Sequence, residues 1–136
     1  MTRINLVPPS ELYDQHLMAE FREIQHVPMS LQRSLNKKSG FHMSEIPNEF
    51  TLNNGHVKFF YDKGLYLANR FDEIKKELFL RDFAINDKPF RLDLFPEKFQ
   101  NNWKPSAEDL LIIRARIAEK LAMKLNWYKK TEVKSR

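Results

Sequence analysis

Residues 1–26 contain the groups in this chain that could do chemistry together. Thr2 follows Met1 and has a small side chain, so removal of Met1 would leave a free α-amine on Thr2. Glu23 lies in the helical pattern that follows, with His16 seven residues before it and His26 three residues after it. This spacing places the three side chains near one face of the helix. An amine, a carboxylate and neighbouring cations are the components of a site that acts through a Schiff base.

An α-amine suits such a site because its reference pKa is about 7.7–8.0, against roughly 10.4 for a lysine side chain. A useful fraction of the amine is therefore unprotonated near neutral pH. The charges of Arg3 and Arg22 would favour the neutral amine further by repulsion. Glu23 could polarise a sugar, stabilise developing positive charge and move a proton in an elimination step. Direct nucleophilic attack by Glu23 is conceivable, but it would not form an imine.

These residues also have ordinary explanations. Many proteins begin with Met-Thr without using the amine, and a helix glutamate is most often solvated. Trp127 and Tyr128 either stack on a nucleotide or pack on the core. A basic set is either surface charge or a clamp on phosphates that fixes register without reading bases: Arg3, Arg22, Arg33, Arg116 and Lys120.

Composition indicates one globular domain over residues 1–136, with 42% hydrophobic and 30% charged residues. The chain has no cysteine and its four histidines lack zinc-type spacing, so we expect neither a metal nor a cofactor. The sequence shows neither a transmembrane-length apolar run nor a signal peptide. We therefore expect a cytoplasmic monomer, nucleoid-associated or acting in a viral host, without a membrane partner. The net charge of +5 favours a polyanion such as DNA, although many basic proteins bind none.

Three helical patterns would position these groups. Ser10 is the expected N-cap of the first, which Pro28 should break near residues 27–28, with the pattern able to resume through Arg33. The second runs from Asp62 to near Asp82. Its expected inward residues are Leu67, Phe71, Ile74 and Leu78, and its expected solvated residues are Glu73, Lys76, Glu77 and Arg81.

The third pattern begins at Ser106, where Asp109 completes a capping box. It directs Leu110, Ile113, Ile117 and Leu121 inward and places Arg116, Lys120 and Lys124 in a basic stripe.

The remaining segments read as connections. Residues 57–61 are either a strand or a buried loop, residues 83–105 are a loop plugged by Phe90, Phe95 and Phe99, and the last residues are frayed. The expected fold is all-α: three main helices in a single compact domain with long ordered loops. The N-terminal segment is threaded between the helices.

Several sequence blocks resemble the pyrimidine-dimer DNA glycosylase/AP lyase family, of the dimer-specific endonuclease V type. They are MTRINL, SEL with DQHLMAEFRE, GHVKFFYDK, and RARIAEK followed by WYK, in the family's order and over most of the chain. The resemblance implies an enzyme that removes UV-induced cyclobutane pyrimidine dimers from double-stranded DNA. It also implies cleavage at abasic sites by β-elimination, through an imine on the Thr2 amine with Glu23 as the essential acid. Base flipping is implied as well.

The resemblance assigns roles to further residues. Arg3, Arg22 and Arg116 match positions that contact the DNA backbone, while His16 and His56 match positions that line the site. His56 follows a turn, so local structure explains it equally well.

The chain also departs from the family pattern. Gln25-His26 stands where the family commonly has Pro-Arg, which removes a phosphate contact that a protonated His26 could partly replace. Residues 28–48 and the polar end differ too. Two alternatives therefore stay open: an enzyme of the same type acting mainly on other base damage, and a non-catalytic basic DNA-binding module.

Overall fold

The structure is a computed structural model and describes residues 4–133. This part of the chain contains the helices α1 (Asp14–Ile24), α2 (Val27–Leu35), α3 (His56–Phe59), α4 (Gly64–Leu80) and α5 (Ala107–Met123). Short 3₁₀ turns lie at η1 (Pro9–Glu11), η2 (Met43–Glu45), η3 (Leu92–Leu94) and η4 (Glu97–Phe99). Residues 4–133 form no strand beyond one isolated bridge, so the all-α prediction is confirmed. None of the helices described is long and apolar enough to cross a membrane.

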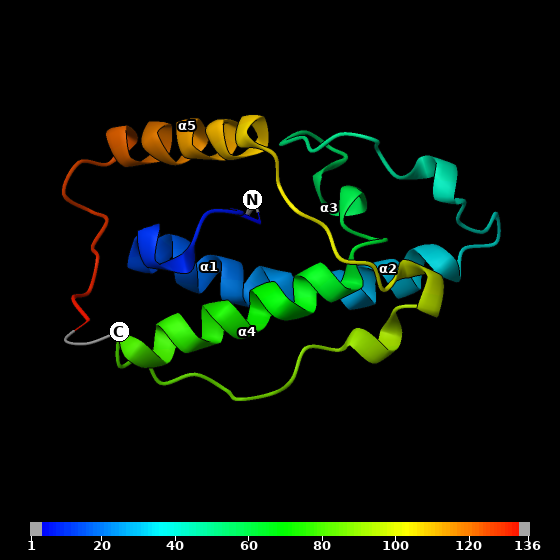
Figure 1. The fold of residues 1–136 in the computed structure, drawn as a ribbon, viewed down its shortest axis with the longest axis horizontal. Coiled ribbons are helices and arrows are strands. Elements are labelled where there is room, and N and C mark those ends of the chain that lie inside the picture. The colour runs from blue at the N-terminus through cyan, green and yellow to red at the C-terminus, as the bar shows by residue number, and fades with distance from the viewer. Residues whose placement is uncertain (1–3, 134–136) are drawn as a thin grey trace.

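Helices α1 and α4 pack side by side and form the centre of the fold (Figure 1). Phe21 of α1 stacks on Phe71 of α4 with ring centroids 5.5 Å apart. Helix α5 lies across from this pair, and the chain enters between α5 and α1 (Figure 1). Residues 4–7, which we call the N-terminal arm, are buried there. The predicted threading of the N-terminal segment between helices is therefore confirmed.

The first helix begins later than predicted. Ser10 is not its N-cap, because Pro8 and Pro9 lead into the turn η1, and the chain is extended again at Leu12. Helix α1 starts at Asp14. The predicted break is confirmed: α1 ends at Ile24 and α2 begins at Val27, with Pro28 in its first turn, where a missing N–H costs no helical hydrogen bond.

Helix α4 confirms the predicted apolar face but corrects its charged face. Leu67, Phe71, Ile74 and Leu78 are fully buried. Glu77 and Arg81 were predicted to be solvated, and this is wrong, because both are buried in an ion pair with Arg81 Nε 2.8 Å from Glu77 Oε2. Arg81 Nη1 also lies 2.9 Å from Asp14 Oδ1 of α1, so the pair joins the two central helices.

Helix α5 begins as predicted. Ser106 Oγ accepts a hydrogen bond from the Asp109 amide at 3.1 Å, and the Ser106 amide donates to Asp109 Oδ2 at 2.9 Å. Ile113 is buried and Leu110 and Ile117 pack on the core, whereas Leu121 is only partly buried.

The segment after residue 55 is neither a strand nor a buried loop. It forms the single-turn helix α3, and Phe59, Phe60 and Tyr61 are buried around its end. In the loop of residues 83–105, Phe95 and Phe99 are buried plugs as predicted, and Phe90 packs against the core.

Candidate functional site

The N-terminal arm is held at its start by His56. The Ile4 amide donates a hydrogen bond to His56 Nε2 at 2.9 Å, and His56 Nδ1 lies 2.8 Å from the Thr51 carbonyl oxygen. Because Nε2 accepts, the ring proton sits on Nδ1 and is donated to Thr51. His56 is therefore a neutral bridge between the arm and the loop before α3.

A buried ion pair holds the next residues of the arm. Glu20 of α1 is fully buried and Arg70 of α4 is 3% exposed, and Arg70 donates to both carboxylate oxygens at 2.8 and 3.0 Å. Burial opposes charge on Arg70, but the Glu20 carboxylate outweighs it and raises the pKa of Arg70. Glu20 Oε1 also accepts from the amide and side chain of Asn5, and Arg70 donates to the Val7 carbonyl.

The arm bends sharply within this anchor. Leu6 has φ of 59°, in the left-handed region, and the Val7 amide donates to the Asn5 carbonyl across it. A hydrogen bond between residues two apart around a positive φ is a γ-turn of the rare, strained type. Glu20 bonds the residue before Leu6 and Arg70 bonds the residue after it, so the pair stabilises a conformation that leucine rarely adopts.

Glu23 lies one turn after Glu20 on α1, but on the exposed side. Its carboxylate Oε2 is 3.5 Å from His26 Nδ1, and the His26 side chain is also exposed. Arg22 is exposed beside Glu23, and Arg33 is exposed in the last turn of α2. His16 and Glu23 are seven residues apart on α1, which puts them on one face about 10 Å apart along the helix.

His16 faces the basic stripe of α5. Burial lowers the pKa of His16, and the charges of Arg116 and Lys120 lower it further, so the ring is neutral near pH 7. Both ring nitrogens are shielded from solvent, and neither has a hydrogen-bond partner within residues 4–133. Tyr128 stacks on the ring with centroids 4.6 Å apart. Two shielded ring nitrogens without a partner make His16 a candidate to hydrogen-bond a ligand group.

Of the other predicted residues, Trp127 lies beside Tyr128, and two lie outside the described residues. Trp127 is half-exposed, meets Tyr128 edge-on at 4.7 Å, and has Lys124 Nζ 4.6 Å from its ring centre. Thr2 and Arg3 lie outside residues 4–133.

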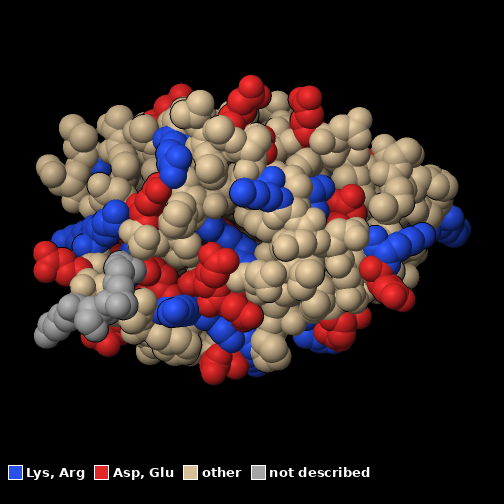
Figure 2. All heavy atoms as spheres, viewed as in Figure 1, with Lys and Arg blue, Asp and Glu red and all other residues tan. Residues whose placement is uncertain are grey.

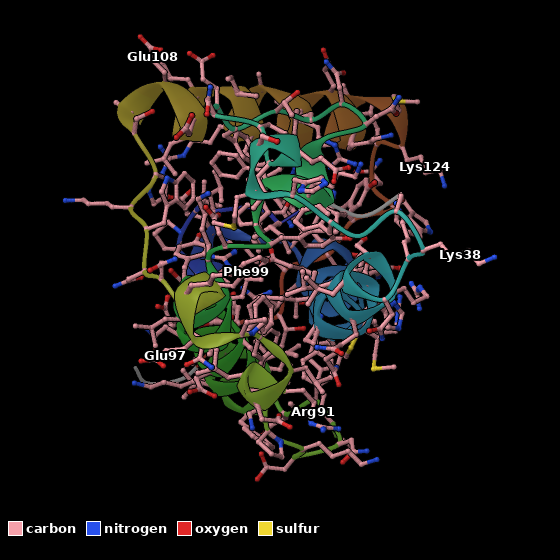
Figure 3. The ribbon with its side chains drawn as sticks, turned by 90° about the vertical axis from the view of Figure 1, so that its right-hand side faces the viewer. Lys38, Arg91, Glu97, Phe99, Glu108 and Lys124 are labelled. Carbon is pink, nitrogen blue, oxygen red and sulfur yellow. The ribbon has the colours of Figure 1, made fainter. Side chains whose placement is uncertain are left out.

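Charged side chains of both signs cover the molecule, and the labelled ones show where some of them project. Acidic and basic side chains are interspersed over the face shown in Figure 2. In the perpendicular view, Lys38 and Lys124 project from the side on which α2 lies, whereas Glu97 and Glu108 project from the opposite side (Figure 3). The exposed cations Arg22 and Arg33, on α1 and α2, make the side that carries these helices a candidate for a surface that meets DNA.

Of the residues that anchor the arm, His56 was predicted to line the site, whereas Glu20 and Arg70 were not predicted. Glu20 and Arg70 are 50 residues apart, and a long-range pair leaves no local signal. A weaker signal was present in α4: Arg70, Glu77 and Arg81 fall on the same helical period as the buried apolar residues. A charged residue on a buried face needs a partner, and that rule could have pointed to all three.

A sequence model of the family described as pyrimidine dimer DNA glycosylase matches residues 1–90. The match includes the N-terminal arm, α1 with Glu23, α3 with His56 and all of α4. All the residues that anchor the arm therefore lie inside the matched region.

Proposed function

The chain belongs to the pyrimidine dimer DNA glycosylase family, and on that premise we propose a DNA repair enzyme with two linked activities. It removes UV-induced cyclobutane pyrimidine dimers as an N-glycosylase, and it cuts the strand at abasic sites as an AP lyase. It acts as a monomer on double-stranded DNA. The nucleophile is the α-amine of Thr2 after removal of Met1, and Glu23 is the acid–base group.

The two activities share one intermediate. The amine attacks C1′ of the damaged nucleotide, the N-glycosidic bond breaks, and its electron pair leaves with the base. Opening of the sugar gives an imine between the amine and C1′. The imine acidifies the C2′ proton, which Glu23 removes, and the C3′–O bond breaks with the phosphate as leaving group. Water then hydrolyses the imine and restores the amine.

The anchored arm is the observation that carries this proposal. Ile4, two residues after Thr2, is fixed by His56, and Asn5 is fixed by Glu20, one helical turn before Glu23. Two residues of chain span at most about 7 Å. If Thr2 carries the nucleophile, its amine is expected within about 7 Å of the anchored Ile4. Such restriction supplies a large part of catalysis by a positioned nucleophile.

The basic residues supply the contacts to the DNA backbone. Arg22 and Arg33 are exposed, and Arg116 and Lys120 face His16 from α5. Phosphate contacts of this kind fix the register of a protein on DNA without reading sequence. A cyclobutane dimer weakens stacking and pairing, which lowers the cost of extruding a nucleotide. The lesion therefore supplies part of its own recognition.

Borohydride trapping tests the proposal directly. Reduction of the imine should link the processed enzyme covalently to duplexes that carry a dimer or an abasic site. Glu23→Gln should remove strand cleavage, whereas Glu73→Gln, at an exposed glutamate on α4, should behave as wild type. A mass measurement of the purified protein shows whether Met1 has been removed.

Two results would contradict the Thr2 mechanism: no adduct with the processed enzyme, or an undiminished adduct after the α-amine has been capped. Nicking in a mixture of damaged duplexes, including a ring-opened purine, tests the lesion. Salt-sensitive binding to undamaged DNA without any cleavage would indicate a binding module instead.

A further inference from the structure

Residues 127–131, which lead into the end that was expected to be frayed, return instead to the start of α1. Residues 127–131, which we call the C-terminal strap, hydrogen-bond to two consecutive residues of α1. Gln15 donates to the Trp127 carbonyl at 2.8 Å and accepts from the Lys129 amide at 3.0 Å. The Asp14 amide donates to the Lys129 carbonyl at 2.7 Å. The strap therefore runs along the first turn of α1.

Asp14 closes the end of the strap. Its Oδ1 accepts from the Thr131 amide at 3.0 Å and its Oδ2 accepts from the Thr131 hydroxyl at 2.6 Å. Asp14 Oδ1 also accepts from Arg81, which is itself buried and paired with Glu77. An exposed strap is thus tied through one carboxylate to the buried ion pair between α1 and α4.

The strap carries an aromatic ring into the candidate site. Tyr128 lies between the two points of attachment, and its ring stacks on His16 at 4.6 Å with an interplanar angle of 28°. Tyr13, the residue before α1, packs edge-on against the Tyr128 ring with centroids 6.4 Å apart. His16 follows the two strap-binding residues directly, so the position of Tyr128 over His16 depends on where the strap is attached.

We propose that Asp14 and Thr131 are positioning residues, which latch the strap and so hold Tyr128 against His16 as a fixed wall of the site. The inference rests on the proposed function for its catalytic consequence, but the latch itself is a property of the fold. Trp127 and Tyr128 then meet DNA as a preformed surface rather than as a loose tail. Preformed aromatic surfaces lose less conformational entropy when a base stacks on them.

The ionisation of two groups agrees with this geometry. Burial would raise the pKa of Asp14, but hydrogen bonds from Thr131 and the charge of Arg81 outweigh it and lower the pKa below its usual value. The carboxylate therefore stays charged in the latch down to acid pH. The pKa of His16 is lowered first by burial, and the Tyr128 ring supplies part of that burial.

Thr131→Val in the full chain tests the latch, because valine keeps the shape of the side chain and removes its hydroxyl donor. Amide hydrogen exchange at Lys129 and Thr131 should quicken about tenfold. The pKa of His16, followed by NMR, should rise towards its ordinary value as the ring becomes more hydrated. Cleavage of a dimer-bearing duplex should slow, and Tyr128→Ala should reproduce the His16 shift.

Glu11→Gln is the matched control, because it breaks the exposed pair with Arg114 of α5, 2.7 Å long, without touching the strap. Unchanged exchange in Thr131→Val would overturn the latch. Faster exchange with an unchanged His16 titration would overturn its effect on the site. If wild-type protein forms no borohydride adduct, the proposed function fails, and exchange and titration alone decide the latch.

Discussion

Replacing His56 by alanine should show how far catalysis depends on the position of the N-terminal arm. His56 accepts from the Ile4 amide, is paired with the Thr51 carbonyl, and packs edge-on against Phe50 and Phe60 at 5.4 Å from each. The substitution leaves two backbone groups unpaired, at about 1–3 kcal/mol each, and opens a cavity. We expect the free energy of unfolding to fall by about 3–5 kcal/mol. A domain above the lower end of the typical range of about 5–15 kcal/mol stays folded after such a loss.

Activity should fall further than this loss of stability explains. A misplacement of about 1 Å at a reacting group can cost about 100-fold in rate, so we expect a loss of that order in single-turnover borohydride trapping. Affinity for undamaged duplex should change little, because His56 is buried within the protein. His56→Gln keeps an acceptor for the Ile4 amide and should recover part of the rate. Folded His56→Ala that traps an abasic duplex at the wild-type rate would refute a positioning role for His56.

Three further predictions concern charge. Glu20→Gln leaves Arg70 buried without its counter-charge and should lower the free energy of unfolding by about 3–5 kcal/mol in urea denaturation; a loss under 1 kcal/mol would mean that the pair does not anchor the arm. His26→Arg places a permanent cation beside Glu23 and should add a phosphate contact, steepening the slope of log K against log salt by about 0.9; an unchanged slope would show that this position does not meet DNA. Lys120→Gln removes one of the charges that lower the pKa of His16, so that pKa should rise in an NMR titration. Because the pKa of His16 is lower in the folded protein than its unfolded value of about 6.5, the unfolded chain binds more protons than the folded protein as the pH falls through that value. Wild-type stability should then decline as the pH falls through about 6.5, and less so in Lys120→Gln.

The sequence predicted those features of the fold that depend on neighbours along the chain. The capping box at Ser106 and Asp109 needs only residues three apart, and the apolar period of α4 repeats within one helix. Pro28 acts on its own backbone, so the end of α1 could be predicted as well. Each of these signals is local.

Features that depend on distant partners could not be predicted in the same way. Glu77 was predicted to be solvated because it stands next to Lys76 in the sequence. In the structure it is buried and paired with Arg81, and Arg81 also bonds Asp14, 67 residues away. The polar end looks frayed by composition, although Thr131 meets Asp14 across 117 residues. A charged residue on a buried face of a helix needs an oppositely charged partner, but the sequence does not show which distant residue is that partner.

Helix α1 sets the distance between the two segments that reach the site. Its first turn binds the strap through Asp14, and its second turn binds the arm through Glu20. On the same helix, His16 lies between Asp14 and Glu20, and Glu23 lies three residues after Glu20. An 11-residue helix has a fixed rise of about 1.5 Å per residue, so segments that are more than 100 residues apart in the chain keep a constant separation. Loops alone would have to lose conformational entropy at each encounter with DNA to reach the same arrangement. Glu20 and His56 hold the N-terminal arm from inside the protein, so under the proposed mechanism changes at these residues should affect catalysis without touching DNA.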